Sequence, residues 1–256
     1  MKRSWFPALL TSGVIVFLFV PLVVLVTNSF NASRFGGGWE GFTWGWYEKL
    51  WDADEVWESV RITLKIAVSA SLASMALGTV AAHALHRFRS WLQSAHSMLI
   101  TLPLVMPDIL MGMSLLALFV LTGIETGLIT IWVAHVTFCL SFVTMVVLGR
   151  LQDFDFTLID AARDLGATRT QAVCKVLLPL LLPGVLAGGL LAFTLSVDDY
   201  VITFFVSGPG TTTLPLRVAS MMKTSRSLPV INALSTLLIA STFLIAALSF
   251  RLQRRS

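Results

Sequence analysis

Six long apolar runs, separated by shorter polar stretches, make up most of this 256-residue chain. Each run is long enough to cross a bilayer as a helix, which takes about 20 residues. We place the runs at 5–27, 62–85, 97–122, 127–148, 183–206 and 230–250. No long Pro/Ser linker or low-complexity tract interrupts them. The pattern therefore predicts one all-α membrane domain over residues 1–256, with about six transmembrane helices.

The composition is typical of a polytopic membrane protein and excludes a soluble one. Only 12% of the residues are charged and 56% are hydrophobic, and the mean hydropathy is +0.83, whereas about a quarter of a soluble domain is charged. The net charge of +4 comes mostly from basic residues beside the apolar runs, so it reflects topology and does not indicate nucleic-acid binding. The first run is too long for a secretory signal and lacks a small-x-small cleavage site, so we expect an uncleaved helix.

Basic residues flank the apolar runs in a pattern that predicts the orientation of the chain. Lys and Arg collect on the cytoplasmic side of membrane proteins. The residues that follow this rule are Lys2, Arg3, Arg87, Arg89, Arg150, Arg163, Arg169, Lys175, Arg251, Arg254 and Arg255. They predict that both termini and the 150–182 loop are cytoplasmic. Arg217, Lys223 and Arg226 count against this orientation, because they fall in a loop predicted to be external.

The first predicted external loop is acidic and rich in tryptophan. Most of its tryptophans are typical of an aromatic belt at the membrane interface. Trp46 and Tyr47 could instead stack on a cation through their ring faces. Trp46 is therefore a candidate for a substrate pathway, and both interpretations stay open.

Three carboxylates, Asp108, Asp198 and Asp199, interrupt runs that are otherwise apolar. A charged side chain at the bilayer centre costs at least about 2.5–3.5 kcal/mol. At the rise of an α-helix, Asp108 would lie roughly 16 Å into the third run and Asp198 roughly 22 Å along the fifth. Pro103 and Pro107 predict a kink that frees carbonyls toward a cavity. Acids at two depths could bind two amines of one elongated cation, so all three are candidate substrate-pathway residues.

Asp199 and Ser196 could each have a purely structural role instead. Asp199 could equally pair with an internal cation such as Lys65 or Arg217, or cap a broken helix. Consecutive helical residues diverge by about 100°, so only one of Asp198 and Asp199 can point along a central axis. Ser196 is a further pathway candidate because its hydroxyl could exchange a hydrogen bond with an amine. The same hydroxyl could instead bond back to the preceding turn.

The polar stretch between the fourth and fifth runs, 150–182, favours helix formation. It carries a weak apolar stripe at helical spacing, formed by Ile159, Ala162 and Leu165. The small side chains of Ala161 and Ala162 would allow another surface to approach closely. Gly166 is expected to end or bend this helix. A short helix held between two membrane spans could transmit motion to the membrane core.

This loop resembles the coupling loop in permease subunits of binding-protein-dependent ABC importers. The family pattern is Glu-Ala-Ala, three residues, Gly and then Leu-Pro about a dozen residues later. The matching positions here are Asp160, Ala161, Ala162, Gly166 and Pro179. Asp160 replaces the usual Glu and shortens the acid by one methylene. The resemblance implies that these residues couple the permease to a cytoplasmic ATPase.

Further motifs resemble, over nearly the whole chain, the second permease subunit of spermidine/putrescine importers. They include "GFTWGWY", "PLVMPDILMGMSLL", "HVTFCLSFV", "LAFTLSVDDYVITFFVSGPG" and "TLPLRV", in that order. The resemblance implies a type I ABC importer permease (MetI-like) fold in the plasma (inner) membrane of a bacterium. The implied partners are a second, different permease subunit, two copies of an ATPase subunit, a periplasmic or extracellular polyamine-binding protein and membrane lipid.

The main functional hypothesis is transport of a polyamine, spermidine and/or putrescine, driven by ATP hydrolysis in another chain. No GxxxxGK[ST] loop is present, so ATP and Mg would be bound by the partner ATPase, and this chain would be neither an enzyme nor a cofactor carrier. The two cysteines have no metal-ligand spacing. A permease for a metal ion or thiamine is the alternative, and three intramembrane acids fit an anion poorly. An intramembrane aspartyl protease is disfavoured, because "SVDDY" and "MPDIL" lack a glycine-rich signature.

Overall fold

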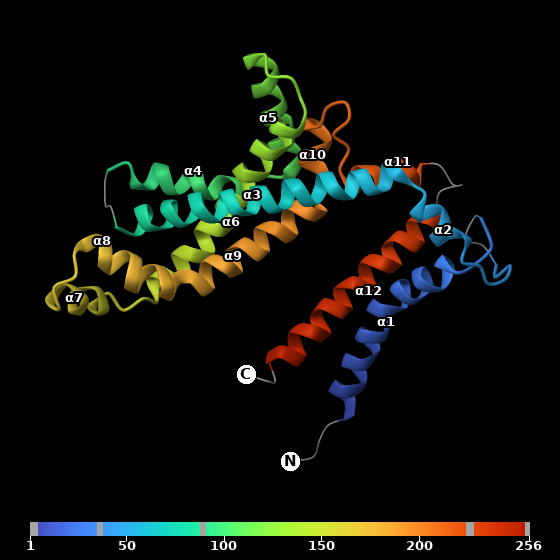
Figure 1. Cartoon of the computed structure of the whole chain (residues 1–256), viewed down its shortest axis with the longest axis horizontal. Coiled ribbons are helices and arrows are strands. Elements are labelled where there is room, and N and C mark those ends of the chain that lie inside the picture. The colour runs from blue at the N-terminus through green and yellow to red at the C-terminus, as the bar shows by residue number, and fades with distance from the viewer. Residues whose placement is uncertain (1–4, 35–37, 88–90, 224–227, 254–256) are drawn as a thin grey trace. The chain divides into compact units, whose positions relative to one another are not determined.

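The computed structural model describes residues 5–34, 38–87, 91–223 and 228–253, and these are almost entirely helical (Figure 1). Of the basic residues weighed for the orientation, Lys2, Arg3, Arg89, Arg226, Arg254 and Arg255 lie outside these described ranges. The long or membrane-related helices are α1 (Trp5–Ser29), α3 (Asp54–Arg87), α4 (Gln93–Val105), α5 (Asp108–Thr122), α6 (Leu128–Gln152), α9 (Leu178–Asp198) and α12 (Leu228–Gln253). The shorter ones are α2 (Gly45–Trp51), α7 (Thr157–Asp164), α8 (Arg169–Ala172), α10 (Val201–Val206) and α11 (Leu214–Met222). A π-helical turn, Val173–Leu177, joins α8 to α9. The predicted all-α class is confirmed.

A helix or bent pair of helices lies at each of the six predicted apolar runs. By length and composition, four described helices could cross a membrane, or five if α4 and α5 count as one broken span. The described apolar part of α12, Leu228–Leu244, is shorter than these. The α4–α5 pair bends by 115° at its break, which consists of Met106 and Pro107 and comes directly before Asp108. The break predicted from the prolines is therefore present, and the chain changes direction there.

The fifth run differs in its limits from the predicted 183–206. Helix begins well before Pro183, because α8, the π-helical turn and α9 form one helical stretch, Arg169–Asp198. The π-helical turn ends two residues before Pro179, whose missing N–H removes the bond that the Lys175 carbonyl would accept in an α-helix. The run then breaks after Asp198, and the remaining residues form the separate helix α10.

Contacts between residues divide the chain into two compact units. The first unit consists of residues 1–57 and 217–256, and the second consists of residues 58–216. In the first unit, α1 and α2 both contact α12. The loop after α1 folds back through an isolated antiparallel bridge between Asn31 and Phe42. Within this unit, Arg217 Nη1 donates to Glu55 Oε2 at 2.7 Å. That the whole chain acts as one permease domain stays a prediction.

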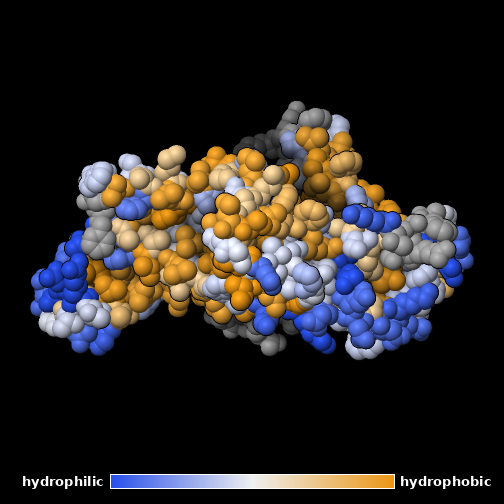
Figure 2. Space-filling model, turned by 90° about the horizontal axis from the view of Figure 1, so that it is seen from above, coloured by the Kyte–Doolittle hydropathy of each residue, from blue (hydrophilic) through white to orange (hydrophobic). Residues whose placement is uncertain are grey.

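The core of the second unit lies mainly between α6 and α9, which contact each other extensively. Glycines on α9 allow this approach. A Cβ on Gly188 would lie 3.3 Å from Val143 Cα of α6, and a Cβ on Gly184 would lie 2.5 Å from Arg150 Cγ. Gly184 and Gly188 are four residues apart, which is the small-xxx-small spacing of close helix pairs in membranes. Figure 2 shows hydrophobic residues over the helices and hydrophilic residues at the end formed by α7 and α8.

Replacing Gly188 with isoleucine is expected to destabilise the second unit by about 1–3 kcal/mol, the usual cost of overpacking a tight contact. The matched control is Gly13→Ile in α1, where an added Cβ meets nothing within 4 Å. The measurement is the fraction of purified protein that stays monodisperse after heating. Equal loss in the two variants would show that close α6–α9 contact is not what Gly188 provides.

Candidate functional site

The break between α9 and α10 is held by the side chain of Asp199. Its carboxylate accepts hydrogen bonds from the backbone N–H of Ile202 at 3.3 Å and of Thr203 at 2.8 Å, and from Thr203 Oγ1 at 2.6 Å. These contacts satisfy free donors at the start of α10, where no intrahelical partner exists. The Asp199 side chain is only 8% exposed. Of the roles that the sequence leaves open for Asp199, the structure shows helix capping; a contact with substrate stays a prediction.

A buried histidine of α6 connects this break to the rest of the second unit. His135 Nδ1 lies 2.6 Å from Ser196 Oγ, Nε2 lies 2.9 Å from Thr203 Oγ1, and Nε2 lies 3.4 Å from Asp199 Oδ2. Thr203 already donates its hydroxyl proton to Asp199, so its oxygen can accept from Nε2–H. Ser196 can then donate to Nδ1, so that each ring nitrogen and hydroxyl of the network has a partner. The network thus ties α6, α9 and α10 together.

The sequence pattern did not single out His135. The signal was present, since a titratable residue inside the fourth apolar run is rare without a partner. Ser196 was considered as a group that bonds back to its own helix or meets an amine, and the structure instead shows its hydroxyl against His135. A second polar contact supports the same junction, because Thr130 Oγ1 of α6 donates to the Val206 carbonyl of α10 at 2.7 Å.

Replacing His135 with leucine is expected to leave the buried Ser196 hydroxyl without its partner and to destabilise the protein by about 1–3 kcal/mol. The expected result is a lower midpoint of thermal unfolding for His135→Leu than for wild type. His96→Leu is the matched control, because His96 is exposed on α4. If both variants unfold at the same temperature, the network does not stabilise the α9–α10 break.

Asp108 and Asp198 differ from Asp199 because both are exposed. Asp108 lies in the first turn of α5, directly after the 115° bend. Asp198 ends α9, directly before the second break. No ion pair to either carboxylate is found within the described ranges of the chain. Each acid therefore lies exposed beside a break between two helices, and a contact with substrate stays a prediction for both.

Trp46 belongs to the other compact unit, so the structure does not group it with the acids. Its ring is 6% exposed, and its Nε1 donates to the Asn31 carbonyl at 2.7 Å. Lys49 Nζ lies 4.5 Å from the ring centroid, a cation–π distance. The ring thus stacks on a cation of its own chain and fixes the first loop, and its place in a substrate pathway stays a prediction.

The predicted coupling loop contains a helix with defined ends. α7 starts after Asp155, which accepts a hydrogen bond from the Thr157 backbone N–H at 3.0 Å. Hydrogen bonds from the Thr157 side chain and backbone hold the pKa of Asp155 below its ordinary value. A lowered folded-state pKa means that this contact is present above the ordinary carboxyl pKa and is lost as pH falls through the lowered value. The start of α7 is therefore fixed at neutral pH.

Gly166 ends α7 with φ of +91°. Its N–H donates to the Arg163 carbonyl at 2.9 Å, and the Ala167 N–H donates to the Ala162 carbonyl at 3.0 Å. This pair of bonds is the Schellman motif, which needs a left-handed residue at this position. The helix end predicted from the sequence is thus present. Asp160 and Ala161 are exposed on α7, and Asp160 Oδ1 lies 4.0 Å from Arg163 Nη1.

The stripe predicted for this helix is divided between two faces. Ile159 is partly buried against the core of the second unit. Leu165 is 90% exposed, and with Leu158 and Ala161 it forms an exposed face at i, i+3 and i+7 spacing. An exposed apolar face on a short helix is available to a partner protein.

A metal site would need several ligating side chains close together. In the part of the chain that the structure describes, no group of three or more His, Cys, Asp or Glu side chains could hold a metal ion.

Comparisons with known proteins agree on one family. Residues 74–256 match the family described as "Binding-protein-dependent transport system inner membrane component". The chain is 41% identical over 243 residues to the spermidine/putrescine transport system permease protein PotC of Haemophilus influenzae, covering 95% of this chain and 94% of that protein. It is 40% identical over 263 residues to the putrescine transport system permease protein PotI of Escherichia coli K12, covering 100% and 93%.

A solved structure matches over nearly the full length. A chain of a bacterial ABC transporter involved in import of the acidic polysaccharide alginate aligns with a TM-score of 0.76 at 16% identity, over 98% of both chains. At this identity the match concerns the fold alone. It confirms the predicted permease fold.

Proposed function

Because the chain belongs to the family of binding-protein-dependent transport system inner membrane components, we propose that it forms the membrane pathway of an ABC importer for spermidine and/or putrescine. The observation that carries the substrate class is the placement of Asp108 and Asp198. Both are exposed carboxylates beside breaks between helices, α4–α5 for Asp108 and α9–α10 for Asp198. The relatives named for spermidine/putrescine and putrescine transport support the same class.

The proposed chemistry is charge neutralisation along the pathway. A carboxylate facing a cavity in a membrane is costly by itself, and an ammonium group that binds it offsets this cost. A charge-assisted hydrogen bond between an ammonium and a carboxylate is also stronger than one between neutral groups. Asp108 and Asp198 would each bind one amine of an extended cation. His135 and Asp199 would hold the α9–α10 break in place, so that Asp198 is presented at a fixed position.

The proposed importer contains further chains. The sequence lacks a phosphate-binding GxxxxGK[ST] loop, which supports ATP hydrolysis, with its Mg, in two copies of a separate ATPase subunit. α7 would dock on that ATPase through the exposed face formed by Leu158, Ala161 and Leu165. A second, different permease subunit and an external polyamine-binding protein would complete the assembly.

The proposed orientation places both termini and the 150–182 loop in the cytoplasm. The distribution of Lys and Arg supports this orientation. Loops 28–58 and 207–229 would then be external. We expect an impermeant reagent added from outside to label single cysteines placed in the 207–229 loop. Labelling only from the inside would contradict the orientation.

The experiment that tests the function is uptake by the assembled importer in proteoliposomes, with its ATPase inside and its binding protein outside. Radiolabelled putrescine and spermidine are the substrates, and a diol of the same chain length as putrescine is the neutral competitor. We expect ATP-dependent uptake of at least one polyamine and no competition by the diol. Uptake of thiamine or a metal ion with no uptake of polyamine would contradict the proposal.

A further inference from the structure

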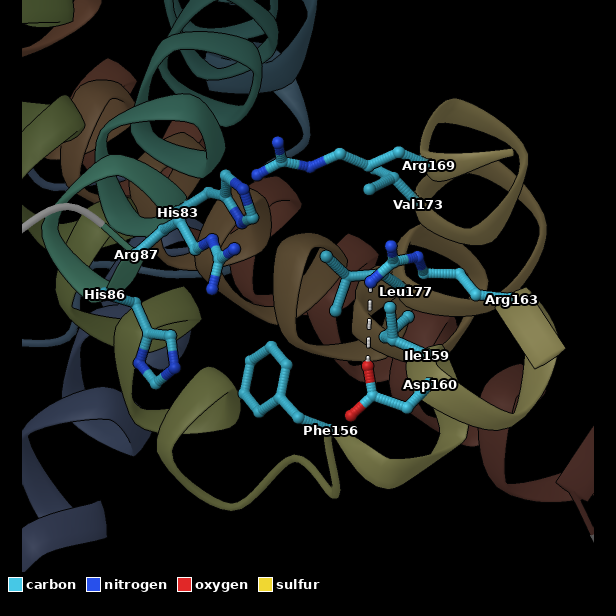
Figure 3. Close-up of a pocket in the computed structure, with 10 residues that line it drawn as sticks. All are labelled: His83, His86, Arg87, Phe156, Ile159, Asp160, Arg163, Arg169, Val173 and Leu177. Carbon is cyan, nitrogen blue, oxygen red and sulfur yellow. Dashed lines mark ion pairs between the residues drawn. The ribbon is translucent and has the colours of Figure 1, made fainter. Parts of the chain in front are cut away.

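A cavity of about 250 Å³ lies in the second unit where the end of α3 meets α7, α8 and the π-helical turn (Figure 3). A water molecule needs only about 10–15 Å³ of such space, so the cavity has room for a larger polar group. Its basic lining residues are His83, His86, Arg87, Arg163 and Arg169. Among the residues that the structure describes, Asp160 is the one acidic residue that lines it. The cavity therefore concentrates positive charge.

Not all of this charge is compensated by the chain itself. Asp160 lies 4.0 Å from Arg163 (dashed line in Figure 3) and offsets one guanidinium. Within the described residues, no ion pair is found for Arg87 or Arg169. The Nδ1 atom of His83 is buried and has no hydrogen-bond partner there either. In Figure 3 the Arg169 side chain extends from α8 toward the His83 ring, with the Arg87 guanidinium on the α3 side of the cavity.

The rest of the lining is apolar. Phe156 stacks on the His86 ring, with centroids 4.9 Å apart and an interplanar angle of 10°. Ile159, Val173 and Leu177 complete this part. A cavity whose lining combines basic groups with aliphatic and aromatic groups suits a ligand that has an anionic head and an apolar body.

We propose that this cavity binds a phosphate group, carried by an anionic phospholipid or present as free phosphate. The planar guanidinium groups of Arg87 and Arg169 can each present two N–H donors to phosphate oxygens, and His83 Nδ1 would gain the partner that it lacks. Basic pockets between membrane helices on the cytoplasmic side bind phospholipid head groups in this way. The cytoplasmic placement of the cavity rests on the proposed orientation; the chemistry of the lining does not.

The ATPase is not the expected occupant, because α7 presents a different face to it. Along an α-helix successive residues turn by about 100°. Ile159, Asp160 and Arg163 face the cavity, whereas Leu158 and Ala161 lie on the opposite side of the helix with Leu165. A phosphate bound between α3 and α8 would therefore leave the proposed docking face open. It would also tie the end of a membrane helix to the loop that contacts the ATPase.

The test uses the assembled importer in detergent and measures retained ligand by native mass spectrometry and the midpoint of thermal unfolding. The probes are phosphatidylglycerol, phosphatidylcholine and inorganic phosphate. We expect wild type to retain phosphatidylglycerol over phosphatidylcholine and to be stabilised by it. The double variant Arg87→Gln/Arg169→Gln should bind at least tenfold more weakly. Stabilisation by inorganic phosphate to the same extent would identify free phosphate as the ligand.

The control is Lys175→Gln, which removes one positive charge from the same loop at an exposed position outside the cavity lining, and it should bind as wild type does. If the double variant does not assemble, His83→Gln keeps every charge of the arginines and should still weaken binding. Equal binding by wild type and by the cavity variants would overturn the proposal. So would protection of the cavity arginines from chemical modification by the ATPase alone, with no effect of lipid or phosphate.

Discussion

Replacing Gly166 with proline is expected to abolish transport while leaving the protein in the membrane. Proline holds φ near −65°, whereas Gly166 has φ of +91°. Proline also lacks the N–H that donates to the Arg163 carbonyl at 2.9 Å. The end of α7 must therefore change direction, and the face that carries Ala161 and Leu165 would be displaced from the ATPase. The measurement is uptake, together with substrate-stimulated ATP hydrolysis, by the assembled importer.

The matched control at this position is Gly166→Asn. Asparagine tolerates the left-handed region better than other L residues and keeps the backbone N–H, so it should retain most of the activity. Ala161→Trp tests the same docking by another route, because an indole on the exposed face of α7 prevents close approach of a partner. Normal uptake in both Gly166→Pro and Ala161→Trp would show that this helix does not couple the permease to ATP hydrolysis.

The features predicted correctly from the sequence are those encoded locally. Six apolar runs give the helices, Pro107 gives the break before Asp108, and Gly166 gives the end of α7. Each of these depends on the covalent structure of one or a few residues. The helices follow from the apolar side chains, the break from the N–H that proline lacks, and the end of α7 from the freedom of glycine to adopt positive φ. The predicted coupling loop could be found for the same reason, since its sequence pattern lies within one short stretch.

The features missed depend on contacts between distant segments. No proline or glycine marks the α9–α10 break after Asp198 in the sequence. The segment "SVDDYVITFF" instead predicts a continuous apolar helix that contains two acids. The break is stabilised by Asp199 acting as a cap and by His135, which is more than sixty residues earlier in the chain. Periodicity in one segment carries no information about such a partner. The cavity at the end of α3 was missed similarly, because its basic residues come from separate helices.

The acids at the two breaks are expected to control substrate affinity. Asp108→Asn and Asp198→Asn each keep the size of the side chain and remove one charge. A hydrogen bond to a charged group contributes roughly 1.5–3 kcal/mol, which corresponds to a loss of about ten- to a hundredfold in apparent affinity for a polyamine. Because both residues are exposed, assembly and thermal stability should stay unchanged. Asp199→Asn should differ, since it weakens the cap of α10 and lowers stability as well.

The measurement is the concentration dependence of polyamine uptake and of substrate-stimulated ATP hydrolysis in the assembled importer. Glu125→Gln is the control, because Glu125 is an exposed acid in the loop between α5 and α6 and its removal changes the net charge equally. A substrate with two amines distinguishes separate contacts from a general attraction. If the acids bind separate ammonium groups, each variant should weaken transport of a diamine more than transport of a monoamine of similar length. Unchanged affinity in both variants, in a correctly assembled importer, would mean that the two acids lie outside the cation pathway.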